Sequence, residues 1–259
     1  MSSTAPSPLR VWLDEGGTLL RLRLARPKAN VIDAAMIAAL ASALEEHLGG
    51  RDLLGVLIDA EGPNFSFGAS VEEHLPAHCA VMLKSFHAVL LRLIASPVPV
   101  LVGARGQCLG GGLELALAGT LLFVAPDAKL GQPEIKLGVI APAASCLLPE
   151  RIARAAADEL LLSGRSLDAA EAETLGLVTA VAADPAEAAV AWFKRHLAGK
   201  SAAALRHAMR AARLDLVERV RAKLVAVETL YLEDVMATRD AVEGLEAFLA
   251  KRPPIWEHR

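Results

Sequence analysis

The sequence of 259 residues has few cysteine and aromatic residues and no excess of basic charge. It contains 3 Cys and 1 Tyr, and aromatic residues make up only 4% of the chain. Three cysteines without a C-x-x-C spacing indicate a reducing compartment rather than a disulfide framework. Lys and Arg number 27 against 30 Asp and Glu, a formal net charge of −3. Such a balance gives no electrostatic attraction to nucleic acid or to an anionic membrane.

Long apolar runs are also missing. The longest, residues 113–125, is interrupted by Glu114 and Thr120 and is too short to cross a bilayer. Residues 1–8 lack a basic start followed by an apolar segment, so no signal peptide is predicted. Hydrophobic residues make up 54% and charged residues 22%, which is typical of a well-packed globular protein. We therefore expect a cytoplasmic protein without a membrane segment.

Hydrophobic periodicity predicts alternating strands and helices in the first two thirds of the chain. Leucines alternate with arginines over residues 18–24, which predicts a half-exposed strand. Asp33 can cap a helix that ends at Leu48, before Gly49. The same patterns predict further strands at 56–58, 97–103 and 121–124 and a helix at 81–94.

The pattern changes after Val181. From residue 185 to residue 251 the sequence indicates one helix after another, rich in Ala, Leu and paired charges. We therefore expect an α/β core at 1–195, which contains the active site, and a helical region at 196–259. Apolar residues that we expect to be exposed, Leu230, Tyr231 and Val235, indicate that this region folds back on the core or packs on another subunit.

Three consecutive glycines, residues 110–112, precede a short helix that is apolar on all sides and should be buried. Glu114, in its first turn, is its single ionisable group. A surface glutamate stabilised by the helix dipole is the ordinary interpretation of such a position. However, burying a lone carboxylate costs several kcal/mol. The glycines also let the backbone approach a ligand and present N–H groups to an anion, so they favour a functional site.

Other motifs are weak by themselves. Glu134 follows Pro133 in what would ordinarily be a turn. The glycines match neither a Walker A loop nor a dinucleotide fingerprint, and residues 64–68 are not a serine-hydrolase elbow. His74 and His78 have the spacing of metal ligands, but Pro76 breaks the helix that would align them, so we expect solvated side chains and no metal.

Taken in order, these pieces resemble the enoyl-CoA hydratase (crotonase) superfamily over nearly the whole chain. The resemblance is carried by Arg26-Pro-Lys-Ala-Asn30, Phe67-Gly-Ala69, Leu109-Gly-Gly-Gly-Leu-Glu114, Gly131-Gln-Pro-Glu134 with Gly138, Gly176-Leu-Val178, and Glu243-Gly-Leu-Glu-Ala-Phe248 with Lys251-Arg252. It implies a ClpP-like spiral of ββα units, followed by C-terminal helices that build a homotrimer or a dimer of trimers.

The resemblance also implies a mechanism. The carbonyl oxygen of a coenzyme A thioester would lie between the backbone N–H groups of Ala69 and Gly111, which stabilise the enolate formed when water adds. Glu114 and Glu134 match the glutamate pair that handles the water. Which of them is the base and which the acid stays open. Family members that isomerise, hydrolyse or decarboxylate often lack one glutamate, so the presence of both favours hydration.

The residues that would contact coenzyme A are inferred only from the positions that match the family's pattern. Phe67, Gly68 and Gly110 surround the oxyanion loop, and Phe248 and Lys251 would approach the nucleotide, often from a neighbouring subunit. The ordinary interpretation of the last two is a core aromatic residue and a solvated lysine. Coenzyme A arrives as part of the substrate, and no further cofactor is expected.

The sequence departs from the common family pattern after Gly138. A glycine-rich stretch is replaced by bulkier residues at 139–149, and Ser70 stands where an acidic residue often follows the oxyanion alanine. The stretch 141–150 looks like that of the family branch that hydrates cyclohexa-1,5-diene-1-carbonyl-CoA to 6-hydroxycyclohex-1-ene-1-carbonyl-CoA in anaerobic aromatic degradation. The alternatives are straight-chain enoyl-CoA hydration, crotonase-type isomerisation or hydrolysis, and a non-catalytic relative that binds coenzyme A or RNA.

Overall fold

The computed structural model describes residues 7–259. Residues 1–6 lie outside the described residues. The prediction that no signal peptide is present depends mostly on these residues. Two sheets form the centre of the fold, a six-stranded sheet in the order β1-β2-β3-β4-β6-β9 and a three-stranded sheet in the order β5-β7-β8. The strands are β1 (Leu9–Asp14), β2 (Leu19–Leu24), β3 (Gly55–Ala60), β4 (Val100–Ala104), β5 (Gln107–Leu109), β6 (Leu121–Val124), β7 (Lys129–Gly131), β8 (Ser166–Asp168) and β9 (Ala180–Val181).

From β4 to β7, successive strands alternate between the two sheets. β4 lies in the large sheet and β5 in the small one, and the pair β6 and β7 repeats this step. From β2 to β9 the large sheet is parallel, with Val56 opposite Val100 and Leu101 opposite Leu121, and only β1 is antiparallel to its neighbour. This repeated step produces a spiral of β-β-α units, as expected.

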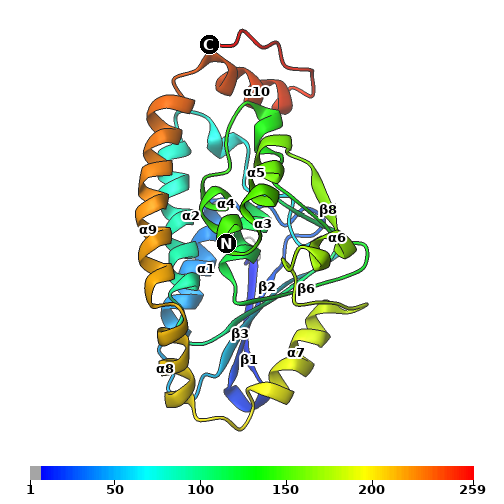
Figure 1. Cartoon of the computed structure of the whole chain (residues 1–259), viewed down its shortest axis with the longest axis vertical. Helices are drawn as coiled ribbons and strands as arrows, with labels where there is room; N and C mark the ends of the chain where they lie inside the picture. Colours follow the sequence, from blue (N-terminus) through cyan, green and yellow to red (C-terminus); the bar gives the residue numbers. More distant parts are fainter. Residues whose placement is uncertain (1–6) are drawn as a thin grey trace, which may run out of the picture.

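Helices cover the sheets and form the C-terminal part of the chain. They are α1 (Ala34–His47), α2 (Cys79–Ile94), α3 (Gly111–Ala118), α4 (Pro142–Leu147), α5 (Arg154–Ser163), α6 (Ala169–Thr174), α7 (Pro185–His196), α8 (Ala202–Ala212), α9 (Leu214–Thr229) and α10 (Arg239–Leu249). Figure 1 shows α9 alongside α2 on one side of the molecule, with α8 at one end and α10 near the C-terminus at the other. In the described part of the chain, no helix is both long and apolar enough to cross a membrane.

Local sequence signals located several elements correctly. The Asp33 carboxylate accepts a hydrogen bond from the Met36 N–H at 2.9 Å, so α1 begins at the predicted cap. β6 has the predicted bounds, and every residue of α3 is buried. The prediction of an apolar helix enclosed by the core is therefore confirmed.

The prediction that β2 is half-exposed is wrong. Arg21, on the face expected to meet solvent, is only 5% exposed. Its guanidinium donates to Asp59 on the neighbouring strand β3 at 2.9 Å and lies 5.1 Å from the centre of the Trp12 ring. Arg23 binds the same carboxylate through two hydrogen bonds of 2.7 Å. The arginine face is buried because a carboxylate and an aromatic ring cover it.

The expected exposure of Tyr231 is wrong as well. Its side chain is fully buried, because a short π-helical segment, η5 (Leu230–Val235), turns it inward from the end of α9. Leu230 is 44% exposed, as expected. The main core contains Val220, Leu224 and Leu245 together with residues of the α/β region, so the helical region folds back on the core. The boundary between 1–195 and 196–259 stays a prediction.

Candidate active site

Glycines bring two backbone segments unusually close together at the start of α3. Gly110 has a φ of +51°, and a Cβ atom there would lie 2.7 Å from the Glu134 Oε1 atom. A Cβ atom on Gly111 would lie 3.0 Å from the Ala69 backbone nitrogen. On the opposite segment, Gly68 has a φ of +107°, a conformation that L side chains rarely adopt. The loop at 67–69 therefore packs directly against the N-terminus of α3.

Two backbone N–H groups at this contact have no acceptor in the part of the chain that the structure describes. Gly68 donates to the Ser66 hydroxyl at 3.0 Å, Ser70 to the Ile32 carbonyl at 3.2 Å, and Gly110 to the Gly131 carbonyl at 2.9 Å. Among residues 7–259, by contrast, none accepts a hydrogen bond from the N–H of Ala69 or Gly111. Neighbouring free N–H groups at a helix N-terminus suit a developing oxyanion.

Glu114 lies within the protein one turn into α3. It is 5% exposed, and its Oε1 atom accepts a hydrogen bond of 2.8 Å from the Ala144 N–H of α4. Burial raises the pKa of Glu114, because the charged form loses water, and the Ala144 hydrogen bond acts in the opposite direction. The stretch that departs from the family pattern therefore supplies a contact to this glutamate.

Glu134 lies in a short 3-10 helix, η3 (Pro133–Leu137), which follows β7. The Gln132 side chain, with its amide nitrogen toward the carboxylate, donates to Glu134 Oε1 at 3.0 Å. Burial, and in second place the negative charge of Glu114, raise the pKa of Glu134 to about 8. Two carboxylates in one site resist ionising together, so at neutral pH one of them is protonated.

Two half-buried arginines bind the opposite end of α3. Arg151 donates to the Leu117 carbonyl at 2.6 Å and also to the Gly119 carbonyl, and Arg213 donates to the same Gly119 oxygen at 3.2 Å. Burial lowers the pKa of Arg151 to about 10. The two guanidinium groups satisfy carbonyls at the negative end of the helix and fix the element that carries Glu114.

One cavity of about 420 Å³ collects almost all the predicted site residues. Its lining includes Phe67, Gly68, Ala69, Gly110, Gly111, Glu114, Glu134 and Phe248. The other lining residues are mostly apolar, including Val71, Met82, Leu83, Phe86, Leu109, Leu137, Val139, Ile140 and Leu245. Both Leu245 and Phe248 come from α10, so the C-terminal helix closes the cavity of its own chain. Lys251 is exposed and does not line this cavity, so its contact to coenzyme A stays a prediction.

His74 was missed as a site residue. The sequence predicts a solvated side chain, but the imidazole lines the cavity, and burial lowers its pKa. Its Nδ1 atom lies 2.7 Å from the Ser70 carbonyl oxygen, so Nδ1 carries the proton. The Ala144 contact was missed too, because an alanine that acts through its backbone leaves no signal in one sequence. Residues 7–259 contain no group of three His, Cys, Asp or Glu placed to hold a metal.

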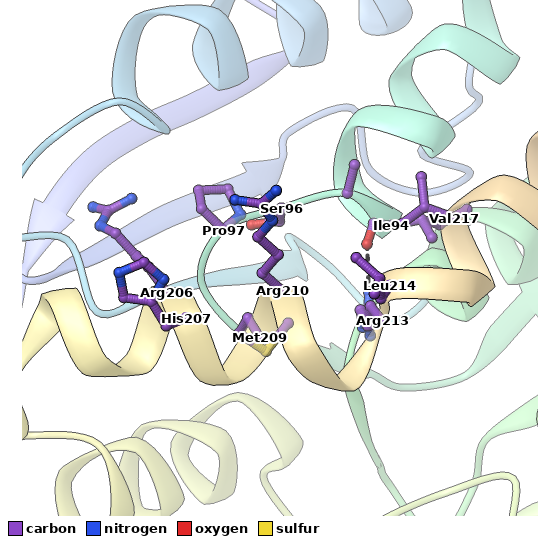
Figure 2. Close-up of a pocket in the computed structure, with 11 residues that line it drawn as sticks. Ile94, Ser96, Pro97, Arg206, His207, Met209, Arg210, Arg213, Leu214 and Val217 are labelled. Atoms are coloured by element: carbon purple, nitrogen blue, oxygen red, sulfur yellow. Dashed lines mark hydrogen bonds between the residues drawn. The ribbon is translucent and has the colours of Figure 1, made fainter.

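A second cavity, of about 390 Å³, has a different chemistry (Figure 2). Arg206 and Arg210 of α8 line it together with Arg213, which lies between α8 and α9 and donates to the Ile94 carbonyl at 2.9 Å. Its lining contains no carboxylate, so it offers no acid and base pair. The cavity with the two glutamates is therefore the candidate active site.

Comparison with known proteins agrees with this geometry. A sequence profile of the family described as Enoyl-CoA hydratase/isomerase matches residues 14–259. The chain belongs to the enoyl-CoA hydratase/isomerase family. Cyclohexa-1,5-dienecarbonyl-CoA hydratase of Thauera aromatica is 63% identical over 257 residues, which cover 99% of this chain and 100% of that relative. Mitochondrial methylglutaconyl-CoA hydratase of Rattus norvegicus is 32% identical over 87% of this chain and 74% of the relative.

Solved structures of enoyl-CoA hydratase/isomerase proteins have the same fold. The crystal structure of carnitinyl-CoA hydratase from Mycobacterium avium superposes with a TM-score of 0.87 at 27% identity, over 98% of this chain and all of the other. A second structure, an enoyl-CoA hydratase from the same species, gives a TM-score of 0.85 at 23% identity. The predicted α/β spiral with C-terminal helices is confirmed.

Proposed function

We propose that this chain adds water to the cyclic thioester cyclohexa-1,5-diene-1-carbonyl-CoA and forms 6-hydroxycyclohex-1-ene-1-carbonyl-CoA. One observation carries the proposal: two free backbone N–H groups and two glutamates line the same, mainly apolar cavity. The choice of substrate is supported by 63% identity to a hydratase named for that diene.

The reaction begins with the thioester carbonyl. Its oxygen accepts hydrogen bonds from the N–H groups of Ala69 and Gly111, which withdraw electrons from the conjugated ring. The water oxygen then forms a bond to the ring carbon β to the carbonyl, and the displaced electron pair moves onto the thioester oxygen as a dienolate. Donors fixed before the reaction stabilise this charge at no reorganisation cost, and losing one such donor typically lowers the rate by about 10²–10³.

The two glutamates divide the proton transfers. Glu114 accepts a backbone hydrogen bond and is the carboxylate that takes the proton from water. Glu134 has its pKa raised to about 8 and is the protonated partner at neutral pH. It donates its proton to the far end of the dienolate, and the ring double bond forms again beside the thioester. Transfer of a proton from Glu114 back to Glu134 restores the starting state.

Protonation at the far end distinguishes the cyclic diene from a linear enoyl thioester. In the ring the new hydroxyl and the new C–H lie on opposite carbons, whereas in a linear substrate they lie on adjacent carbons. The wall formed by Val139, Ile140 and Pro142 is bulkier than the usual glycine-rich stretch, and its apolar surface suits a compact ring.

Coenzyme A is the only nonprotein group that the proposal needs, and it enters with the substrate. The exposed Phe67 and Phe248, at 49% and 54% exposure, mark the mouth of the cavity and would contact the thioester arm. We propose assembly into a trimer or a dimer of trimers on the basis of the family resemblance.

The test is a product assay with purified protein. Incubation with the cyclic dienoyl-CoA should add the mass of one water and leave the thioester intact. Crotonyl-CoA in a parallel reaction should turn over more slowly. A free carboxylate product would favour hydrolysis, an unchanged mass with a shifted double bond would favour isomerisation, and preference for crotonyl-CoA would favour linear hydration.

A further inference from the structure

The last residues of the chain, 253–259, fold back along α10 and are fastened to its first half. The Asp240 carboxylate accepts hydrogen bonds from the N–H groups of Glu257 and His258, at 2.7 and 2.8 Å. Glu243, one turn further along α10, accepts another from the segment at 2.8 Å. Figure 1 shows the segment returning along α10 to the end marked C. Two side chains of the helix thus hold the backbone of the segment in place.

This arrangement places the Trp256 ring over the contact between α10 and η3. A Cβ atom on Gly244 of α10 would collide with the Leu137 carbonyl oxygen at the end of η3, and it would lie 3.0 Å from the ring. A Cβ atom on Gly138, directly after η3, would lie 3.1 Å from the same ring. Because both glycines lack a side chain, the backbones meet directly and the indole packs against both of them.

The η3 side of this contact carries Glu134. Gly138 ends η3 with a φ of +71°, and its N–H donates to the Ile135 carbonyl at 3.2 Å. The following N–H, that of Val139, donates to the Glu134 carbonyl at 3.3 Å. Trp256 therefore packs against the residue that closes the helical turn of this glutamate. Trp256 and Ile135 line a separate hollow, whereas Glu134 lines the active-site cavity, so η3 lies between the two.

The α10 side of the contact closes the active-site cavity, which Leu245 and Phe248 line. Among the helices and strands of the described chain, α10 packs chiefly on η3 and on η2 (Glu72–His74). These two short elements also line the cavity, through Lys136 and His74. A helix with so few packing partners opens locally at a small cost unless another segment holds it.

We propose that residues 253–259 form a clasp, with Trp256 as the positioning residue that holds α10 against η3 and keeps the active-site cavity closed around the thioester. The inference rests on the proposed function. A closed cavity excludes water from the reacting ring and holds Glu134 at a fixed place beside it. Loosening the clasp should weaken thioester binding first, because Leu245 and Phe248 form part of the wall, and should slow proton transfer second.

Support of the hydrophobic core does not account for this residue. Trp256 is 37% exposed and belongs to neither of the buried clusters that form the core of the described chain. Its ring instead lies against backbone of η3 and α10, the two elements beside the cavity. Its loss should therefore affect these elements more than the global free energy of unfolding.

The first test measures steady-state kinetics on the cyclic dienoyl-CoA. We expect Trp256→Ala to raise KM roughly 10-fold and to lower kcat by a smaller factor. Trp256→Phe keeps an aromatic ring and should stay within about twofold of the wild type. Trp192→Ala is the matched control, because it removes an indole from α7, outside the active-site cavity, and should leave KM unchanged. Urea denaturation of each variant shows that the measured protein is folded.

Asp240→Asn tests the clasp with the indole still present. It weakens the anchor that holds the N–H groups of Glu257 and His258, so KM should rise in the same direction as in Trp256→Ala. Since both changes act through one clasp, the double variant should be no worse than Trp256→Ala alone. This variant also decides the question if Trp256→Ala does not fold.

A further readout needs no turnover. Hydrogen exchange measured by mass spectrometry should be faster in α10 and η3 of Trp256→Ala than in those of the wild type, and unchanged in α7. Unchanged exchange in α10, or a wild-type KM in both Trp256→Ala and Asp240→Asn, overturns the clasp. If the wild type does not hydrate the diene but α10 exchange still rises in Trp256→Ala, the proposed function is rejected and the hold of the clasp on α10 stands.

Discussion

This protein buries carboxylates in two regions and treats them differently. Asp59, on the large sheet, is 2% exposed and is bound by the guanidinium groups of Arg21 and Arg23. Glu114 and Glu134, in the cavity between α3 and η3, have no guanidinium or ammonium partner within hydrogen-bond distance among the described residues. A paired buried carboxylate stays charged and holds strands together, whereas an unpaired one can exchange protons near neutral pH.

Removing either glutamate should have the largest effect on turnover. Glu114→Gln and Glu134→Gln keep the side-chain shape but remove proton transfer, so kcat should fall by about 10²–10⁴. Steady-state kinetics on the cyclic dienoyl-CoA measures the loss. Glu173→Gln, on the exposed surface of α6, serves as the control. Full activity in both active-site variants would reject the two-carboxylate mechanism.

Gly110→Ala should damage the site through a steric contact. The added Cβ would lie 2.7 Å from Glu134 Oε1 and displace that carboxylate, so kcat should fall by about 10²-fold. Gly176→Ala is a close control, because Gly176 also has a positive φ, +74°, but no atom lies within 4 Å of the new Cβ. Gly176→Ala should lose about 1–2 kcal/mol of stability from backbone strain, measured by urea denaturation. Gly110→Ala should lose more, because its φ of +51° and ψ of −129° lie outside the left-handed helical region and its Cβ also meets Glu134. Equal activity in the two would show that Glu134 tolerates the shift.

The pH dependence of turnover should reveal the acid. Glu134 donates a proton only while it is protonated, and its pKa is raised to about 8 by burial and by the charge of Glu114. The wild-type kcat should therefore decline above about pH 8, by tenfold per pH unit. The profile from pH 6 to 10 measures this limb. A constant kcat up to pH 10 would contradict the assignment of Glu134 as the acid.

Asp59→Asn should affect stability and leave turnover of the folded enzyme almost unchanged. Its loss leaves the Arg21 guanidinium buried without its main partner, and breaking such a buried pair costs about 3–5 kcal/mol. Urea denaturation measures the change, and kcat per folded molecule is the comparison. A large drop in kcat would show that the two regions are coupled.

Much of this arrangement could be predicted from the sequence. Asp33 marked the start of α1, and the glycines with Glu114 marked a buried helix next to a functional turn, because capping and apolar periodicity are local properties. Eight of the nine predicted site residues line one cavity, and Lys251 is the exception. Motifs in family order indicated which distant segments meet, which periodicity alone does not reveal.

Other features depend on contacts between distant segments. The alternation of leucine and arginine predicted a solvent-facing Arg21. It could not reveal that Asp59, 38 residues later, pairs with this arginine. Tyr231 looked exposed because a π-helical segment rotates it away from the α-helical pattern. Trp256 and Gly138 lie in distant parts of the sequence, so no spacing rule could join them.

The most direct test of the central claim is a crystal structure with a nonreactive cyclic acyl-CoA thioester. The thioester oxygen should lie within hydrogen-bond distance of both the Ala69 and the Gly111 nitrogen atoms. The ring carbon β to the carbonyl should face the carboxylates of Glu114 and Glu134. A carbonyl that points away from the two N–H groups, or a ring outside this cavity, would contradict the account.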